Sequence, residues 1–237
     1  MSSPMSADTD TSGHNPDGTR RLYGRAKGKA LSAYQARMMA EKLPQVRVPD
    51  APADPLSGIA GYDAQWLEIG FGGGEHLVHM AKTYPDAGLI GIEPFENGVA
   101  KVLACMDREN IANISLHHGD ARPVMARMAD QSFDKIFVLF PDPWPKVRHF
   151  KRRIIDPEFL RDIHRLLKPG GKFRFASDII SYVDWTLIRV MDDGGFAFSP
   201  ASKDDWRKPY ADWPGTRYEA KAFREGRECH YFEFTKI

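Results

Sequence analysis

Glycine residues follow one apolar, strand-like segment and lead into a helical pattern. They include Gly70, Gly72 and Gly74. Only glycine combines a tight turn with close approach of the backbone to a bound molecule, and nucleotide-type cofactors bind at such turns. The dinucleotide fingerprint G-x-G-x-x-G would need a glycine where Glu75 stands, and the Lys-Ser/Thr of a phosphate-binding loop does not follow. The turn therefore favours a cofactor that has no phosphate group.

Acidic residues accompany the ends of three successive expected strands. Glu68 precedes the glycine turn, Glu93 ends the second strand, and Asp120 follows the third. A carboxylate at Glu93 is placed to accept both hydroxyls of a ribose, and Asp120 to reach an adenine. S-adenosylmethionine carries a sulfonium and an ammonium group, so acidic residues suit it. We therefore expect an S-adenosylmethionine site; a nicotinamide-dependent oxidoreductase is the alternative from another chemical class.

A proline-rich loop follows the fourth expected strand and leads into a basic run, residues 146–153. The loop, Pro141–Pro145, has Asp142 as its polar member and Trp144 as its aromatic member. The basic run holds five Lys or Arg in eight positions, whereas the whole chain has a net charge of +1. Local clusters of this kind bind the phosphates of nucleic acids, and a solvated charged turn is the alternative interpretation.

Short apolar runs alternate with helical patterns over residues 65–234. The expected strands are Gln65–Ile69, Leu89–Glu93, Ile114–His118, Phe133–Phe140, Lys172–Ala176, Phe196–Phe198 and His230–Phe234. The expected helices are Leu77–Tyr84, a segment around Val99–Met106, a helix capped by Asp156 that runs through Leu167 and is stopped by Pro169-Gly170-Gly171, and Ile179–Met191. This alternation predicts an α/β fold whose parallel sheet carries helices on both faces.

The N-terminal part differs from the rest in composition. Residues 1–19 are rich in Ser, Thr, Asp, Asn, Gly and Pro, which predicts a disordered tail. Residues 20–60 read as a basic arm followed by a proline-rich linker, and residues 61–237 as the catalytic domain. The overall composition, with 42% hydrophobic and 27% charged residues, is that of a globular protein.

Several classes of protein are excluded by simple patterns. No apolar run approaches the ~18 residues that cross a bilayer, so we expect no membrane partner. Two cysteines, Cys105 and Cys229, cannot form a disulfide framework, which favours the reducing cytoplasm. No C-x-x-C or H-x-x-x-H spacing occurs, so we expect no metal. Monomer and homodimer both stay open.

Five segments together resemble one known family, the bacterial tRNA (guanine-N7)-methyltransferases (TrmB). The segments are Gly70–Gly74, Glu93, Pro141–Lys146 with Arg148–Arg153, Ser177-Asp178, and Gly215–Lys221. The resemblance covers about residue 23 to the C-terminus. It implies a Rossmann-like class I methyltransferase fold, with a mostly parallel seven-stranded sheet and an antiparallel last strand. It also implies transfer of a methyl group from S-adenosylmethionine to N7 of guanine in tRNA, at guanine 46 of the variable loop.

The resemblance also implies roles for individual residues. The cofactor site would be lined by Glu68, Gly70, Gly72, Gly74, Glu93, Asp120 and Asp142, and Asp142 would be catalytic. The tRNA would be bound by Lys146, Arg148, His149, Phe150, Lys151, Arg152, Arg153, Asp178, Thr216, Arg217, Tyr218 and Glu219. Val147 and Phe150 stand where more polar or basic residues are expected.

The chemistry of guanine N7 sets what such a site must do. N7 carries an in-plane lone pair in the neutral base, so it can attack a methyl group without prior deprotonation, and catalysis is mainly positioning. Asp142 could stabilise the positive charge of the product or hold the N–H edge of the guanine. Trp144 could stack on a base or pack within the protein. Asp178 and Glu219 could accept from the donor edge of guanine. A non-catalytic RNA-binding module and a small-molecule methyltransferase are further alternatives.

Overall fold

The computed structural model describes residues 21–24 and 26–237, so the tail predicted at 1–19 lies outside the described residues. The strands are β1 (Ala64–Ile69), β2 (Ala87–Ile92), β3 (Ile114–His117), β4 (Phe133–Leu139), β5 (Leu167–Ser177), β6 (Phe196–Ala197) and β7 (His230–Lys236). The helices are α1 (Ala33–Arg37), η1 (Met38–Lys42), α2 (Leu43–Val46), α3 (Glu75–Thr83), α4 (Glu96–Glu109), α5 (Ala121–Met125), η2 (Val147–Arg152), α6 (Pro157–Leu166), α7 (Ile180–Asp193), α8 (Asp204–Arg207) and α9 (Arg217–Arg224).

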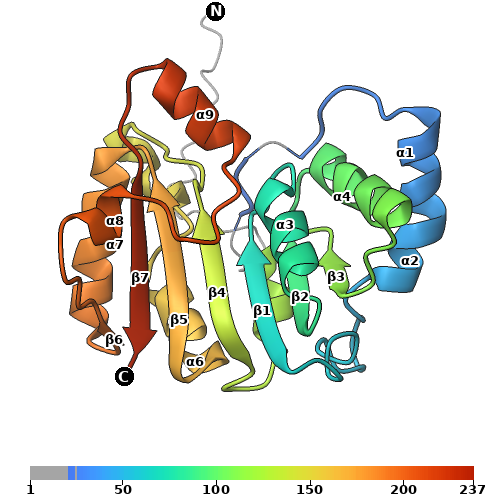
Figure 1. The fold of residues 1–237 in the computed structure, drawn as a ribbon, viewed down its shortest axis with the longest axis horizontal. Coiled ribbons are helices and arrows are strands. Elements are labelled where there is room, and N and C mark those ends of the chain that lie inside the picture. The colour runs from blue at the N-terminus through green and yellow to red at the C-terminus, as the bar shows by residue number, and fades with distance from the viewer. Residues whose placement is uncertain (1–20, 25) are drawn as a thin grey trace, which may run out of the picture.

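The strands form one seven-stranded sheet in the order β3-β2-β1-β4-β5-β7-β6. β1 pairs in parallel with β2 and β4, and β4 pairs in parallel with β5. β7 is antiparallel to both β5 and β6, and its arrow points opposite to that of β1 in Figure 1. The expected α/β fold, with a mostly parallel sheet and an antiparallel last strand, is confirmed.

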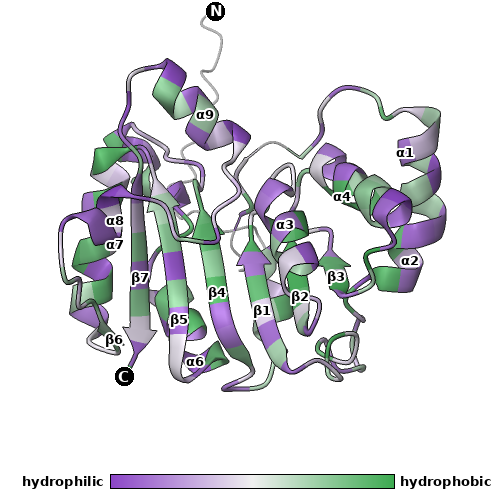
Figure 2. Cartoon of the chain, viewed as in Figure 1, coloured by the Kyte–Doolittle hydropathy of each residue, from purple (hydrophilic) through white to green (hydrophobic). Residues whose placement is uncertain are grey.

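Alternate residues along the central strands face two separate apolar cores. In β4, Ile136 and Val138 belong to one core, whereas Phe137 and Leu139 belong to the other. Side chains of a strand alternate between its two faces, so each face of the sheet carries its own core. Figure 2 shows this end of β4, near the arrowhead, as continuously apolar. Helix α6 contributes to the first core and helices α3 and α4 to the second.

The strand order reverses between β1 and β4. The chain leaves β1 toward β2 and β3 on one side and returns to place β4 on the other side of β1. Because these strands are parallel, their carboxyl ends meet at one edge of the sheet (Figure 1). Ligands of open α/β sheets bind in the crevice at such a reversal.

Helices α1, η1 and α2 occupy a stretch that the sequence analysis interpreted as arm and linker. α1, η1 and α2 follow one another without a break, and Pro44 lies just beyond the π-helical segment η1. Ser32 caps α1 through a capping box with Gln35, and Tyr34 donates a 2.6 Å hydrogen bond to Asp107 of α4. These helices therefore pack on the body of the molecule; the division into arm, linker and catalytic domain stays a prediction.

The boundary between α6 and β5 differs from the expected one. α6 ends at Leu166, and Leu167 already belongs to β5, where it pairs with Phe133. Asp156 caps α6 with Pro157 at its first position, as expected. Pro169 and the glycines after it lie within the irregular beginning of β5, beside the shift in register between β4 and β5.

Candidate active site

The glycine turn between β1 and α3 adopts left-handed backbone conformations. The φ angles of Gly70, Gly72 and Gly74 are 75°, 57° and 77°. A Cβ at Gly74 would lie 2.1 Å from a side-chain atom of Val102 in α4, so packing as well as φ requires glycine there. A Cβ at Gly70 would meet no atom within 4 Å, which leaves open space beside the turn. The turn thus leaves backbone atoms without side chains beside an open space.

A cavity of about 430 Å³ lies at the carboxyl ends of β1, β2 and β4. Its volume falls within the range of small-molecule sites. Its apolar members include Ile69, Ile92 and Val138, one from each strand. Its charged members are Glu93, Asp120, Asp142, Arg152 and Arg217. The cavity therefore lies at the reversal of strand order and combines an apolar part with three carboxylates.

Glu93 is buried, with 6% of its surface exposed, and holds the glycine turn. Its Oε2 accepts the backbone N–H of Gly72 at 2.6 Å, and its Oε1 accepts that of Phe95 at 2.9 Å. Burial raises the pKa of this carboxyl, and the two N–H donors oppose that rise. Each carboxylate oxygen keeps further acceptor capacity, so Glu93 can still accept ligand hydroxyls.

Asp142 lines the same cavity from the loop after β4. Its side chain is partly open to solvent, desolvation by the surrounding groups raises the pKa of its carboxyl, and within the described residues no hydrogen-bond donor contacts it. A Cβ at Gly24 would lie 3.1 Å from its Oδ2, so the N-terminal segment comes close to this carboxylate. Phe140 and Trp144, on either side of it, have φ angles of 49° and 41°. Side chains in this left-handed region are strained, and such strain gathers at functional sites.

An N-terminal segment, Leu22–Gly24, lines the cavity although the sequence analysis assigned it no role. The Arg152 guanidinium lies 4.9 Å from the ring centroids of both Tyr23 and Trp144. The two rings are in edge-to-face contact at 6.1 Å. Arg152 therefore joins the basic run to the N-terminal segment at the mouth of the cavity. In the sequence, the one indication that this segment contacts the body of the protein is the apolar pair Leu22-Tyr23 within an otherwise basic stretch.

The remaining two predicted cofactor carboxylates differ in placement. Asp120 lines the cavity and caps α5, where it accepts the N–H of Arg122 at 3.1 Å. Glu68 lies outside the cavity lining and is buried beside His76, with 2.7 Å between Oε2 and Nδ1. Adjacent strand residues point to opposite faces, so Glu68 lies on the other side of the sheet from its neighbour Ile69. A smaller neighbouring hollow is lined by Glu68 together with Gly70 and Tyr218, and the cofactor role of Glu68 stays a prediction.

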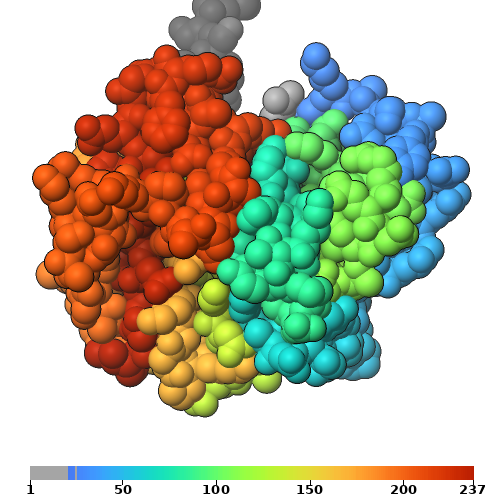
Figure 3. All heavy atoms as spheres, viewed as in Figure 1, coloured from blue at the N-terminus to red at the C-terminus, as the bar shows by residue number. Residues whose placement is uncertain are grey.

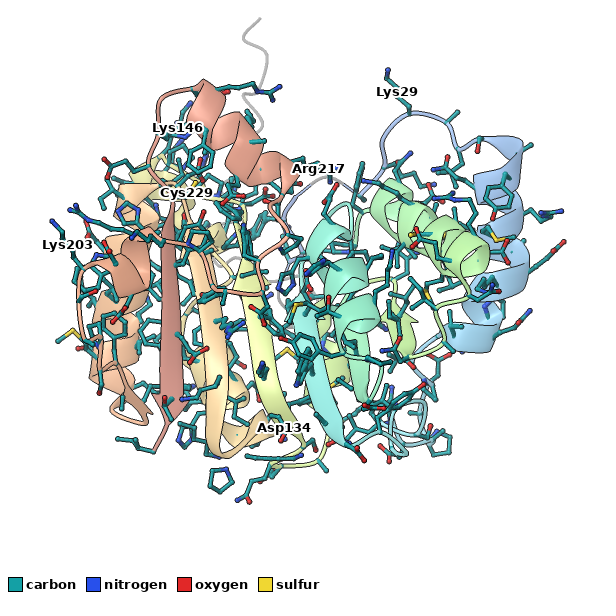
Figure 4. All side chains as sticks on the ribbon, viewed as in Figure 1. Lys29, Asp134, Lys146, Lys203, Arg217 and Cys229 are labelled. Atoms are coloured by element: carbon teal, nitrogen blue, oxygen red, sulfur yellow. The ribbon has the colours of Figure 1, made fainter. Side chains whose placement is uncertain are left out.

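The basic run divides into exposed, cavity-lining and buried members. Lys146, Arg148 and Lys151 are exposed on or beside η2, and Arg152 lines the cavity. Figure 4 shows Lys146 and Arg217 at the end of the molecule opposite to Asp134. Arg153 is only 1% exposed. Burial of its guanidinium is incompatible with the RNA contact expected for Arg153.

Two uncharged members of the run, Phe150 and His149, also pack on the protein. Phe150 is half-buried, with its ring 5.3 Å from that of Trp185 and 3.8 Å from the Arg153 guanidinium. His149 makes edge-to-face contact with Trp144 at 5.9 Å. Partial burial and the surrounding cations lower the pKa of His149. Phe150 is thus a packing residue in this structure, and Trp144 packs on protein groups at the rim of the cavity.

Helix α9 begins with a capping box that uses two of the predicted tRNA-binding residues. The Thr216 hydroxyl accepts the N–H of Glu219, and the Glu219 carboxylate accepts the N–H of Thr216. Glu219 is also buried and accepts from Trp213 Nε1 at 2.9 Å and from the hydroxyl of Tyr231. The carboxylate of Glu219 therefore already accepts three protein donors, and its expected contact with guanine stays a prediction.

Between these two capping residues, Arg217 and Tyr218 line the cavity. Tyr218 is 42% exposed and packs beside Gly72. Burial raises the pKa of Glu93, and the positive charge of Arg217 opposes part of that rise. In Figure 3 the C-terminal segment lies directly against α3 on this face. Asp178, at the end of β5, accepts a 2.7 Å hydrogen bond from Arg227.

The structure also bears on membrane-spanning helices and on metal sites. Within residues 21–24 and 26–237, no helix is long and apolar enough to span a membrane. In that same part of the chain, His, Cys, Asp and Glu side chains do not gather in threes in a way that could hold a metal ion.

Comparisons with known proteins give a consistent result. A family model described as "Putative methyltransferase" matches residues 63–232. The tRNA (guanine-N(7)-)-methyltransferase of Agrobacterium fabrum is 46% identical over 222 residues, covering 92% of this chain and 96% of the relative. The protein of the same name from Ruegeria sp. (strain TM1040) is 45% identical over 239 residues, covering 96% and 92%.

Solved structures share the fold at low sequence identity. The 16S rRNA methyltransferase KamB aligns with a TM-score of 0.55 and 15% identity, covering 90% of this chain and 98% of that one. The aminoglycoside resistance methyltransferase NpmB1 aligns with a TM-score of 0.54 and 18% identity, covering 76% and 90%. The fold is therefore that of the Rossmann-like class I methyltransferases. At the level of sequence, the chain belongs to the bacterial tRNA (guanine-N7)-methyltransferase family.

Proposed function

We propose that this protein transfers a methyl group from S-adenosylmethionine to N7 of guanine in tRNA, at guanine 46 of the variable loop. The observation that supports it most is the cavity at the reversal of strand order. There Glu93 and Asp142 line one volume together with Arg217 and Tyr218, and exposed cations of the basic run lie in the same chain segment as Asp142. The relatives named above carry this activity in their names.

The residues of the cavity suit S-adenosylmethionine. Three carboxylates, Glu93, Asp120 and Asp142, line it, and a cationic cofactor benefits from them. Open space beside Gly70 leaves room for a ligand against bare backbone. Glu93 would hold ribose hydroxyls, and Asp120 would lie near the base of the cofactor. When bound, the cofactor supplies an electrophilic methyl group on its sulfonium.

The chain itself would act mainly by orientation. Guanine N7 offers a lone pair in the plane of the base, so no residue has to remove a proton before attack. Asp142 would stabilise the positive charge that grows on the guanine ring or hold its N–H edge, and either role needs the carboxylate ionised. Tyr218 and Arg217 border the same volume and would restrict the position of the base. Correct alignment of the reacting atoms can supply a large part of the rate enhancement.

The exposed cations would hold the RNA. Lys146, Arg148 and Lys151 lie on the surface beside the cavity loop. Contacts of Lys and Arg with phosphates supply most of the non-specific affinity for nucleic acids and make it depend steeply on salt. The proposal thus separates residues for the cofactor, inside the cavity, from residues for the phosphates, outside it.

A direct assay tests the proposed function. Full-length protein is incubated with labelled S-adenosylmethionine and unmodified tRNA, and N7-methylguanine is mapped by chemical strand scission. We expect one label per tRNA at guanine 46, and none in a matched tRNA with adenine at that position. Label at another guanine would refute the position, and absence of label would refute the activity. Binding titrations with NADH and S-adenosylmethionine separate the oxidoreductase alternative.

A further inference from the structure

Arg153 stands out because its guanidinium is buried among aromatic rings. The guanidinium carbon lies 3.8 Å from the ring centroid of Phe150, 4.7 Å from that of Tyr182 and 5.1 Å from that of Trp185. Among the described residues, no carboxylate forms a salt bridge with it. Burial of a cation without an ion partner is costly unless its N–H groups are satisfied. The hydrogen bonds of the Arg153 guanidinium therefore indicate its role.

Each nitrogen of the Arg153 guanidinium donates to a defined acceptor. Nε donates to the carbonyl of Pro143 at 2.9 Å. Nη1 donates to the carbonyl of Ser181 at 2.8 Å, and Nη2 donates to the Ser181 hydroxyl at 3.1 Å. A planar fork with fixed N–H directions makes this set possible, and a lysine ammonium cannot reproduce it.

The two acceptor residues belong to two different segments, the loop after β4 and the start of α7. Pro143 lies between Asp142, which lines the cavity, and Trp144, whose φ is 41°. Ser181 lies in the first turn of α7, three residues after Asp178. A strained loop keeps its conformation only when surrounding contacts hold it. The bond from Arg153 to Pro143 is such a contact, placed directly beside the strained residue.

We propose that Arg153 is a positioning residue, which ties the Asp142 loop to the start of α7 and so orients Asp142 toward the guanine, rather than a contact for RNA. The inference rests on the proposed function, because it concerns how that function is performed. It assigns neighbouring arginines of the basic run opposite tasks: Arg153 faces inward and acts through Asp142, whereas Arg148 faces solvent and is free to meet phosphates.

The decisive variant is Arg153→Lys, because it keeps the charge and removes the fork. The single-turnover rate constant of methyl transfer is measured with protein in excess over tRNA and with saturating S-adenosylmethionine. This rate constant is independent of the folded fraction, which alters only the amplitude. We expect it to fall about 10- to 100-fold, as for a small misplacement of a reacting group. Affinity for tRNA and its salt dependence should change less than about twofold, because no phosphate contact is lost. Arg161→Lys, an exposed arginine of α6, is the matched control.

A second variant serves if Arg153→Lys fails to fold, as judged by S-adenosylmethionine binding stoichiometry. Ser181→Ala removes one of the three hydrogen bonds and should lower the same rate constant by a few-fold without weakening tRNA binding. An unchanged rate constant in the folded variants, or a loss confined to tRNA affinity and its salt slope, would overturn the inference. Absence of transfer by the wild-type protein is a distinct outcome: it would overturn the proposed function, and the inference with it.

Discussion

Two carboxylates in the cavity are held by the protein in contrasting ways. Glu93 accepts two backbone N–H groups and is fixed by them. Asp142 receives no donor from the described residues, so its whole acceptor capacity is open to a ligand, whereas Glu93 keeps only part of its own. Burial raises the pKa of both groups. At the residue scale, this contrast supports the proposed roles of Glu93 in cofactor binding and of Asp142 in catalysis.

Replacement of Asp142 should slow methyl transfer strongly and leave cofactor binding almost unchanged. In Asp142→Ala we expect methyl transfer to fall about 10²-fold or more, because a charge that faces the reacting base is lost. Affinity for S-adenosylmethionine should stay within a few-fold of the wild-type value. Single-turnover transfer to tRNA and calorimetric titration with the cofactor measure the two quantities. Near-normal transfer would remove Asp142 from the mechanism.

Replacement of Glu93, by contrast, should weaken the binding of the cofactor. In Glu93→Ala we expect affinity for S-adenosylmethionine to fall about 10- to 100-fold, since hydrogen bonds to a charged acceptor contribute about 1.5–3 kcal/mol. Equilibrium titration measures this loss. Glu96→Ala, in the first turn of α4 and outside the cavity lining, is the matched control. Equal affinities in the two variants would contradict the assignment.

At the scale of elements, short helices present some members of a motif and bury others. η2 exposes Arg148 and Lys151, and the residue that follows it, Arg153, is buried. α9 buries Glu219 and leaves Tyr218 at the cavity. The helical turn decides this division, because residues close in sequence point in different directions around a helix. The structure thus divides each sequence motif into residues that are exposed or line the cavity and residues that are buried.

Charge reversal on the exposed side of η2 should weaken tRNA binding alone. In the double variant Arg148→Glu and Lys151→Glu we expect tRNA affinity to fall at least about tenfold and its salt slope to decrease by about two. Affinity for S-adenosylmethionine should not change. The control reverses two other exposed cations, Lys203 and Arg207, and Lys203 projects away from Arg217 in Figure 4. Unchanged tRNA binding in the η2 variant would favour a solvated charged turn.

The capping box of α9 should couple stability to substrate binding. Thr216→Ala removes the acceptor for the Glu219 N–H and should cost about 1 kcal/mol, a decrease of about 2–4 °C in Tm. It should also weaken tRNA binding, because Arg217 and Tyr218 follow directly. Ser32→Ala removes the equivalent cap of α1, which is remote in sequence, and should lower Tm alone. Thermal unfolding and tRNA titration distinguish the two variants. Identical effects on tRNA affinity would contradict the coupling.

At the scale of the whole molecule, the cavity is assembled from distant parts of the chain. Residues 22–24 close one side, the ends of β1, β2 and β4 form its base, and the start of α9 borders another side. Arg152 links the first of these parts to the loop after β4 through Tyr23. The site is thus not confined to the predicted catalytic domain, residues 61–237.

Two N-terminal truncations should therefore differ in cofactor binding. Removal of residues 1–19 leaves every described lining residue in place, and we expect an unchanged affinity for S-adenosylmethionine. Removal of residues 1–24 also takes away Leu22, Tyr23 and Gly24 and should lower that affinity by roughly tenfold, through loss of apolar contact. Isothermal titration of both shortened chains measures the difference. Equal affinities would show that the segment does not contribute to the site.

The sequence by itself determined the sheet and the place of the site. β1, β2 and β4 were predictable because strands covered on both faces are almost continuously apolar, and glycines with acidic residues mark their carboxyl ends. Helices α1 and α2 were not predicted, because prolines in their neighbourhood resemble a linker until packing against α4 is known. Only the tertiary structure decided which side of each element a residue occupies. That choice placed Arg153 in the interior and Glu68 outside the lining of the larger cavity, and it brought Tyr23 to that cavity, because burial depends on contacts between segments far apart in the chain.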